Sequence, residues 1–155
     1  MDWYSIIKTL HILSAAVLFG TGLGIAFFMF VGLRSPIYAQ RLFAARATVI
    51  ADLWFTLPAV VVQPISGAYL IFSGGLVWNS VWLFWAYALY LIAGLCWIPV
   101  VFIQIRMRNL LSAHETGDRL SDAEFDGLYK IWFILGWPAF LSIIAIYWLM
   151  VAKPA

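Results

Sequence analysis

Four long stretches of apolar residues follow one another along the chain, separated by shorter polar connections. They predict helices at about residues 4–31, 48–72, 81–105 and 129–151. Each stretch is long enough to cross about 30 Å of hydrocarbon as a helix that rises about 1.5 Å per residue. The stretches are too long for the strands of a membrane barrel, which need about 9–11 residues. The pattern therefore predicts an all-α fold, an integral membrane four-helix bundle.

The composition supports a membrane protein. Of the 155 residues, 65% are hydrophobic and 10% are charged, whereas a soluble domain carries about 25% charged residues. A soluble fold has too few polar groups here to cover its apolar surface, and the lipid bilayer removes that problem. We expect a single domain over residues 1–155. The first apolar stretch is about twice as long as the core of a signal peptide, so we interpret it as a retained span.

The basic residues predict the orientation of the bundle. They flank the first and third connections at Arg34, Arg41, Arg46, Arg106, Arg108, Arg119 and Lys130. Lys8 and Lys153 lie near the other ends of the helices. By the positive-inside rule, these two connections face the cytoplasm and both termini face outward. Because topology explains the basic residues, we expect no nucleic-acid partner.

His11 is the first candidate for chemistry, because an ionisable residue inside a membrane span is costly and is usually kept for a function. Ser14, Ala15 and Gly22 follow on the same helix face and leave room for a flat macrocycle or a close neighbouring helix. A neutral imidazole that faces the interior of a bundle is a common axial ligand of haem iron. The alternative is a histidine that only forms a hydrogen bond to another helix.

Polar residues also follow one face of the second predicted helix. This polar seam contains Asp52, Thr56 and Gln63, with Ser66 and Gly67 further along. It predicts either the wall of a cofactor pocket or narrow pathway, or a purely structural contact. For Asp52 we favour a structural ion pair with one of the arginines near the cytoplasmic boundary. The candidate partners are Arg41, Arg46 and Arg106.

Two prolines interrupt the same helix. Proline has no backbone N–H, so Pro58 and Pro64 should leave the carbonyl groups of Trp54 and Val60 without their helical donors and bend the helix.

Tyr87 and Tyr90 lie on the third predicted helix, which runs antiparallel to the first. They should therefore reach the same depth as His11, and Gln63 and Ser66 should reach it from the second helix. We expect these side chains to converge in the outer half of the bundle. Together with Lys8, one turn before His11, they form the predicted cofactor site.

Several other chemistries lack the residues that they need. The single cysteine, Cys96, excludes an intramolecular disulfide and a cysteine-cluster metal site. The sequence has no H-E-x-x-H, no C-x-x-C and no glycine-rich phosphate loop. Gly20 and Gly24 form a small-xxx-small pair on the face opposite His11, a pattern typical of close helix contacts or homo-oligomers.

These motifs resemble a family of bacterial integral membrane proteins, the domain of unknown function 2269. The resemblance covers nearly the whole chain. It rests on Lys8-Thr9-Leu10-His11, Phe19-Gly20-Thr21-Gly22-Leu23-Gly24, Ala51-Asp52, Gln63-Pro64, Cys96-Trp97-Ile98-Pro99, Gln104-Ile105-Arg106-Met107-Arg108 and Tyr147-Trp148-Leu149-Met150. The family is in turn similar to the copper-resistance D proteins and the HemJ-type protoporphyrinogen oxidases, which share the Lys-x-x-His element.

The resemblance implies haem b at His11, because that histidine is implicated in haem binding in the HemJ-type enzymes. Their later motifs are not evident here, so their oxidase activity does not carry over. The leading hypothesis is a haem b protein of the bacterial inner membrane that acts in electron transfer or as an oxidoreductase. One alternative is transport of copper or another small solute. The other is a non-catalytic accessory subunit of a larger membrane complex.

Overall fold

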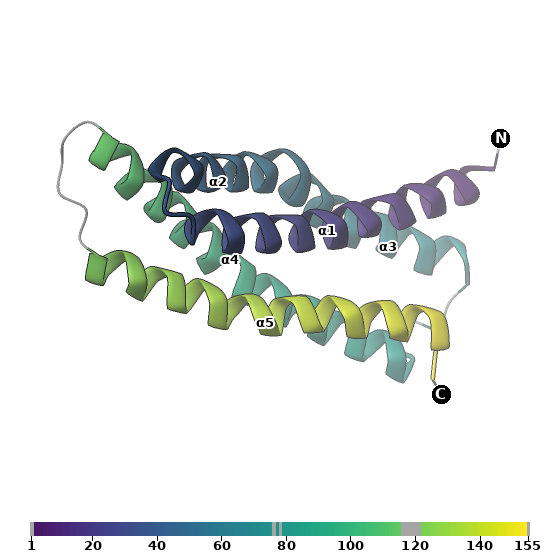
Figure 1. Ribbon diagram of the computed structural model, residues 1–155. Helices are drawn as coiled ribbons and strands as arrows, with labels where there is room; N and C mark the ends of the chain where they lie inside the picture. Colours follow the sequence, from purple (N-terminus) through teal and green to yellow (C-terminus); the bar gives the residue numbers. More distant parts are fainter. Residues whose placement is uncertain (1, 76, 78, 116–121, 155) are drawn as a thin grey trace.

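The computed structural model describes residues 2–75, 77, 79–115 and 122–154. Over these residues the chain folds into a bundle of long helices, with both termini at the same end (Figure 1). The helices are α1 (Trp3–Leu33), α2 (Tyr38–Ala51), the π-helix η1 (Asp52–Thr56), α3 (Leu57–Ser73), α4 (Val81–Glu115) and α5 (Asp122–Ala152). Because α2, η1 and α3 are continuous, the described residues form four helices long and apolar enough to cross a membrane. The predicted four-helix membrane fold is confirmed.

The helices are longer than the apolar stretches predicted, mainly at the end opposite the termini. We call this the basic end, since Arg34, Arg41, Arg46, Arg106, Arg108 and Lys130 lie there. There α2 begins at Tyr38, α4 continues to Glu115 and α5 begins at Asp122. These added turns are amphipathic and bury one face against the bundle. Mean hydropathy missed them because their other face is polar.

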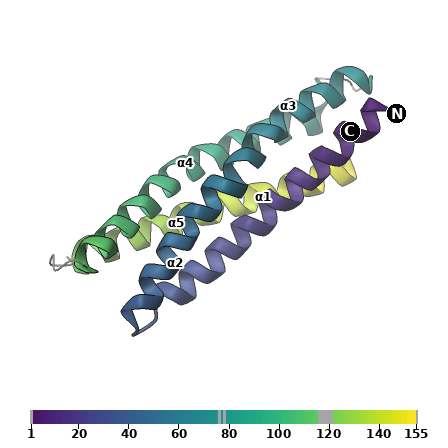
Figure 2. The ribbon, with the colours of Figure 1, turned by 90° about the horizontal axis from the view of Figure 1, so that it is seen from above.

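Two apolar clusters hold the bundle together. The helix pairs α4–α5, α1–α3 and α1–α2 make the most extensive contacts, and Figure 2 shows α1 running beside the continuous rod of α2 and α3. The larger cluster fills the basic end and contains Met29, Leu33, Leu42, Ala45, Val100, Met107, Leu111, Phe125 and Trp132. The smaller one lies near the termini and contains Ile71, Trp82, Leu83, Ala86 and Leu149. Most other large apolar side chains are exposed, as lipid-facing residues should be.

The rod of α2, η1 and α3 changes its hydrogen-bond pattern in the middle. In η1 the N–H of Leu57 donates to the carbonyl of Asp52, five residues earlier, and Pro58 follows at once. Further along, the hydroxyl of Tyr90 donates to the carbonyl of Val60 at 2.6 Å. That carbonyl is one of the two that we expected a proline to free. A side chain of α4 thus replaces the donor that Pro64 lacks.

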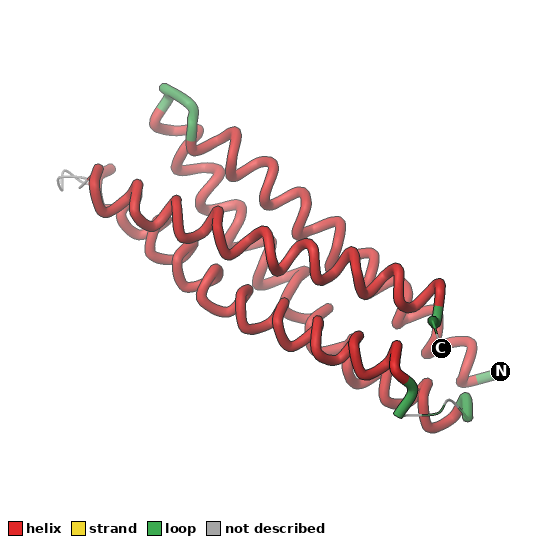
Figure 3. The backbone as a smooth tube through the Cα atoms, turned by 90° about the horizontal axis from the view of Figure 1, so that it is seen from below, coloured by secondary structure: helices red, strands yellow, loops and turns green. Residues whose placement is uncertain are grey.

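A side-chain cap and a glycine turn mark two of the helix ends. At the start of α1, the Asp2 carboxylate accepts hydrogen bonds from the Ser5 hydroxyl and the Tyr4 N–H, and these lower its pKa. After α3, Gly75 adopts φ 63°, a conformation that favours glycine. The short turns at both ends of the bundle are visible in Figure 3. Arg119, one of the residues used to predict the orientation, lies outside the described residues.

Candidate functional site

His11 of α1 lies against α3 in the half of the bundle near the termini. Its Nδ1 is 2.8 Å from the hydroxyl oxygen of Ser66, and the imidazole is half-buried. Gly67 lies beside the ring, so that a Cβ added there would sit 3.3 Å from His11 Cε1. The absence of a side chain at Gly67 therefore lets the imidazole approach α3 closely.

The hydrogen bonds around Ser66 favour the neutral form of His11 that carries its proton on Nδ1. The Ser66 hydroxyl has one hydrogen, and its oxygen lies 2.6 Å from the carbonyl of Val62, the usual acceptor for a serine inside a helix. With that hydrogen donated to Val62, the serine oxygen accepts the N–H of His11 Nδ1. The Nε2 atom of this neutral imidazole then carries a lone pair.

Gln63 fixes the backbone of α1 at the same place. Its side-chain amide donates to the carbonyl of His11 and to the hydroxyl of Ser14, both at 2.8 Å. The Ser14 hydroxyl in turn donates to the His11 carbonyl at 3.0 Å. The small residue at position 14 therefore serves the close approach of α3 to α1, one of the two uses that we predicted for it.

The predicted convergence of five side chains is met in part. His11, Gln63 and Ser66 form the network described above, and we call them, with Ser14 and Gly67, the His11 cluster. Tyr90 reaches α3, but its hydroxyl binds the Val60 carbonyl. Tyr87 is a correction: it is 48% exposed and lines a separate cavity with Asn79, Val81 and Phe84. The exposure of Tyr87 shows that α4 turns it away from the cluster.

Lys8 is exposed, one turn before His11 toward the terminus of α1. Its position at the edge of the span leaves its ammonium group free to reach the water–lipid boundary.

The hydrogen bond of Tyr90 gives a direct test of the proline interpretation. We expect Tyr90→Phe to lower the free energy of unfolding by about 0.6–1.7 kcal/mol, the average and the maximum for hydrogen bonds between membrane helices. In a Pro64→Ala background, the restored N–H can donate to Val60, so the same change should cost less. Reversible unfolding in mixed detergent micelles measures both values. Tyr87→Phe is the matched control and should change nothing. Equal costs of Tyr90→Phe in the two backgrounds would contradict the interpretation.

A second polar cluster lies further inside the bundle, around the π-helix. Asp52 and Thr56 of η1 and Gln104 of α4 are 3%, 4% and 2% exposed. The indole N–H of Trp97 donates to the Asp52 carboxylate at 3.3 Å. The side chains of Thr56 and Gln104 also lie close enough to the Asp52 carboxylate to interact with it, although the second carboxylate oxygen and the Thr56 hydroxyl do not meet strict hydrogen-bond geometry within the described residues. The polar seam of the second span is thus buried, as a seam facing the interior should be.

The ion pair predicted for Asp52 is not formed within the described part of the chain. Arg46 binds Glu115 at 2.9 Å, and Arg106 binds Glu124 at 2.6 Å. Arg41 places its guanidinium over the ring of Phe125, 5.0 Å from the ring centre. The three arginines stay at the basic end, where acidic residues on the added turns of α4 and α5 are available. Asp52 lies deeper in the bundle than they reach.

A comparison with protein families shows which family the chain belongs to. Residues 5–154 match the model of a family described as predicted integral membrane protein (DUF2269). The chain belongs to this family. None of the curated proteins and none of the solved structures matches it significantly. The family resemblance stated from the sequence is therefore confirmed.

Sequence reasoning missed two parts of the polar interior of this DUF2269 protein. Trp97 was noted only as part of a family motif, yet its indole N–H is a donor to Asp52. The π-helix was not predicted at all, although its position directly before Pro58 is a usable signal. Both features surround the same buried carboxylate.

Proposed function

We propose that this DUF2269 protein binds haem b through Nε2 of His11 and serves in electron transfer or oxidation of a membrane-accessible substrate. We place it in the bacterial inner membrane with both termini in the periplasm. The observation that carries the proposal is the contact between His11 Nδ1 and Ser66. A histidine ligand usually donates its second ring N–H to a neighbouring acceptor, which fixes the ring and leaves the other nitrogen for the metal.

The residues present fit a haem ligand. Haem b proteins use a neutral imidazole as an axial ligand, and the hydrogen bonds of Ser66 favour that form of His11 with a lone pair on Nε2. The ring is half-buried rather than enclosed, so it stays accessible from one side. The Lys8-x-x-His11 spacing, similar to that of the HemJ-type enzymes, adds independent support.

Each residue of the cluster has a separate task in this proposal. Haem b, when bound, supplies one-electron oxidation and reduction. His11 holds the iron, and Ser66 orients the imidazole. Gln63 binds the backbone carbonyl of His11 and so sets the position of His11 against α3. The ammonium group of Lys8, at the edge of the span, pairs with a propionate.

An absorption spectrum of the purified protein tests the proposal. Protein from haem-replete cells should show a Soret band, and His11→Ala should lose it while keeping its helical fold. Ser66→Ala removes only the orienting acceptor, so it should bind haem about 10–100-fold more weakly. His114→Ala, at the basic end, is the control and should keep the full band. A colourless, folded wild-type protein from such cells would refute haem binding.

Transport of a small solute is the second candidate. Its support is the polar seam, where Asp52 and Thr56 bring buried oxygen atoms close together inside the bundle. Copper has less support than other solutes, because Cu(I) prefers clustered thiolate and thioether ligands and the chain has one cysteine and four methionines. Solute uptake by a protein without a haem spectrum would favour this function.

A further inference from the structure

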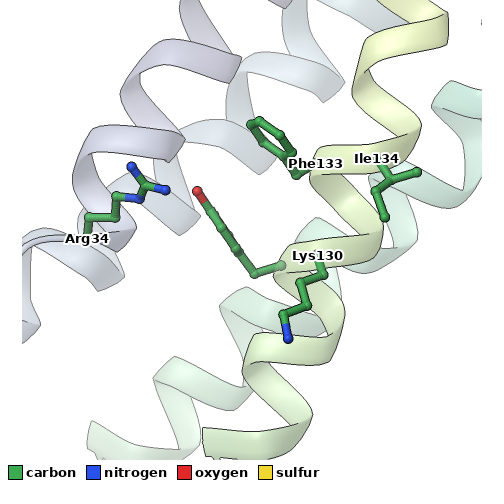
Figure 4. A pocket seen from close by; sticks show the side chains of 5 residues that line it. Arg34, Lys130, Phe133 and Ile134 are labelled. Atoms are coloured by element: carbon green, nitrogen blue, oxygen red, sulfur yellow. The ribbon is translucent and has the colours of Figure 1, made fainter.

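A small cavity at the basic end lies between the end of α1 and the first turns of α5. Its volume is about 140 Å³, and it is lined by Arg34, Tyr129, Lys130, Phe133 and Ile134. Figure 4 shows Arg34 reaching from α1 toward α5, which carries the labelled Lys130, Phe133 and Ile134. The cavity is several times larger than the volume of about 30 Å³ that a water molecule occupies in the liquid. It therefore has room for a compact polar group.

The two cations at this cavity are not taken up in ion pairs. Arg34 and Lys130 form no ion pair with the described residues, whereas Arg46 and Arg106 at the same end do. Both unpaired cations are exposed, so they are available to a ligand. Two cations at one small cavity create a local field that favours an anion.

Arg34 is held in place by aromatic side chains. Its guanidinium lies over the ring of Phe30, 3.8 Å from the ring centre. Phe30 packs against Phe133 at 6.2 Å between ring centres, and Phe133 stacks on Tyr129 at 6.5 Å. Stacking occupies the flat face of the guanidinium and leaves the N–H groups at its edge for hydrogen bonds.

Tyr129 supplies a donor that lacks a partner. Its hydroxyl oxygen is buried and has no hydrogen bond to any described residue. A buried hydroxyl without a partner costs free energy, so such a group usually marks a place where a ligand or water binds. Together with Arg34 and Lys130, Tyr129 gives the site both charged and neutral hydrogen-bond donors. Phosphate oxygens are the acceptors that match this set.

We propose that this cavity binds the phosphate of an anionic phospholipid from the surrounding leaflet. A lipid is favoured over free phosphate because the cavity continues into lipid-facing surface. Phe133 and Ile134 are 41% and 66% exposed, and the exposed side chains of Trp137 and Leu141 follow along the same helix. Acyl chains would lie along these residues while the headgroup reaches Arg34 and Lys130. Basic pockets between membrane helices commonly recognise anionic headgroups in this way.

Native mass spectrometry of the delipidated full-length protein in mild detergent tests the proposal. We expect dioleoylphosphatidylglycerol to bind more tightly than dioleoylphosphatidylcholine. Arg34→Gln and Lys130→Gln should each weaken phosphatidylglycerol binding about fivefold, since each basic residue near anionic lipid contributes about that factor. Arg108→Gln removes the same charge at the same end but outside the cavity, and should leave tight binding unchanged. Equal losses in all three variants would mean unspecific attraction and would overturn the site.

Tyr129→Phe is the sharper variant because it changes no charge. It should weaken phosphatidylglycerol binding about tenfold, the value of one hydrogen bond to a charged group. Without lipid it should melt no earlier than wild type, since the hydroxyl has no partner in the protein. A variant that binds the lipid normally would overturn the proposal. Displacement of the lipid by millimolar inorganic phosphate, with phosphate binding lost in Arg34→Gln, would assign the site to free phosphate instead.

Discussion

Replacing Gln63 with glutamate is expected to destabilise the protein more than replacing it with leucine, although glutamate has nearly the same shape. The Gln63 amide is a double donor, to the His11 carbonyl and the Ser14 hydroxyl. Leucine loses both hydrogen bonds, at a cost of about 1–2 kcal/mol. An ionised glutamate also loses both, and it adds a negative charge within the membrane span, which costs about 2.5–3.5 kcal/mol more.

The unfolding free energy in mixed micelles distinguishes these effects, and pH adds a second test. At acidic pH the new glutamate is protonated and regains one O–H donor, so part of its lost stability should return, whereas the leucine variant should not respond. Gln40→Glu is the matched control. Gln40 is exposed and accepts a hydrogen bond from Ser35, which a carboxylate also does, so this change should be nearly neutral. Equal stability of the two Gln63 variants at neutral pH would contradict the hydrogen-bond network.

Gly32→Ala is expected to destabilise the contact between α1 and α2 by about 1–3 kcal/mol, the usual cost of overpacking. A Cβ at Gly32 would overlap the Cβ of Ala44 and would lie 3.6 Å from the carbonyl oxygen of Gln40. Ala44 is itself 7% exposed and belongs to α2, so neither helix can move aside without separating the buried faces at the basic end. The clash involves the atom closest to the backbone, which no change of side-chain conformation relieves.

The partner substitution makes this prediction strict. Ala44→Gly removes the obstructing atom, so Gly32→Ala should cost less in that background than in the wild type. Gly24→Ala is the control, because a Cβ there meets no atom within 4 Å. It should be neutral or slightly stabilising, since alanine favours a helix over glycine by about 1 kcal/mol. Thermal unfolding of the four variants gives the comparison. A Gly32→Ala variant as stable as Gly24→Ala would refute the close contact.

The number and type of membrane helices could be predicted from the sequence because lipid imposes a simple rule on length and polarity. The carbonyl of Val60 could be predicted too, since proline lacks its donor whatever surrounds it. The depth of a residue along its helix could also be predicted, and this placed Gln63 and Ser66 at the level of His11. The direction in which a side chain points around its helix could not be predicted. Tyr87 was misplaced because that direction depends on how neighbouring helices rotate when they pack.

The arginines show a further limit. Arg46 and Arg106 were expected as candidate partners of Asp52, but they form ion pairs with Glu115 and Glu124 instead. Both acids lie on helical turns that the hydropathy pattern did not reveal. Once α4 extends to Glu115 and α5 begins at Asp122, those acids lie nearer than the buried carboxylate. An error in the ends of two helices thus became an error in the choice of salt bridges.

The π-helix at Asp52–Thr56 makes chain length, rather than residue type, a determinant of the His11 cluster. A π-turn holds one residue more than an α-turn closed by the usual hydrogen bond. Deleting this extra residue would let the rod become a plain α-helix while Gln63 and Ser66 stay on the face toward α1. The same deletion in an α-helical part of the rod would rotate everything after it by about 100° and would point both residues away from His11. The π-helix can therefore absorb a one-residue change in chain length that would dismantle the cluster if it fell in the α-helical turns on either side.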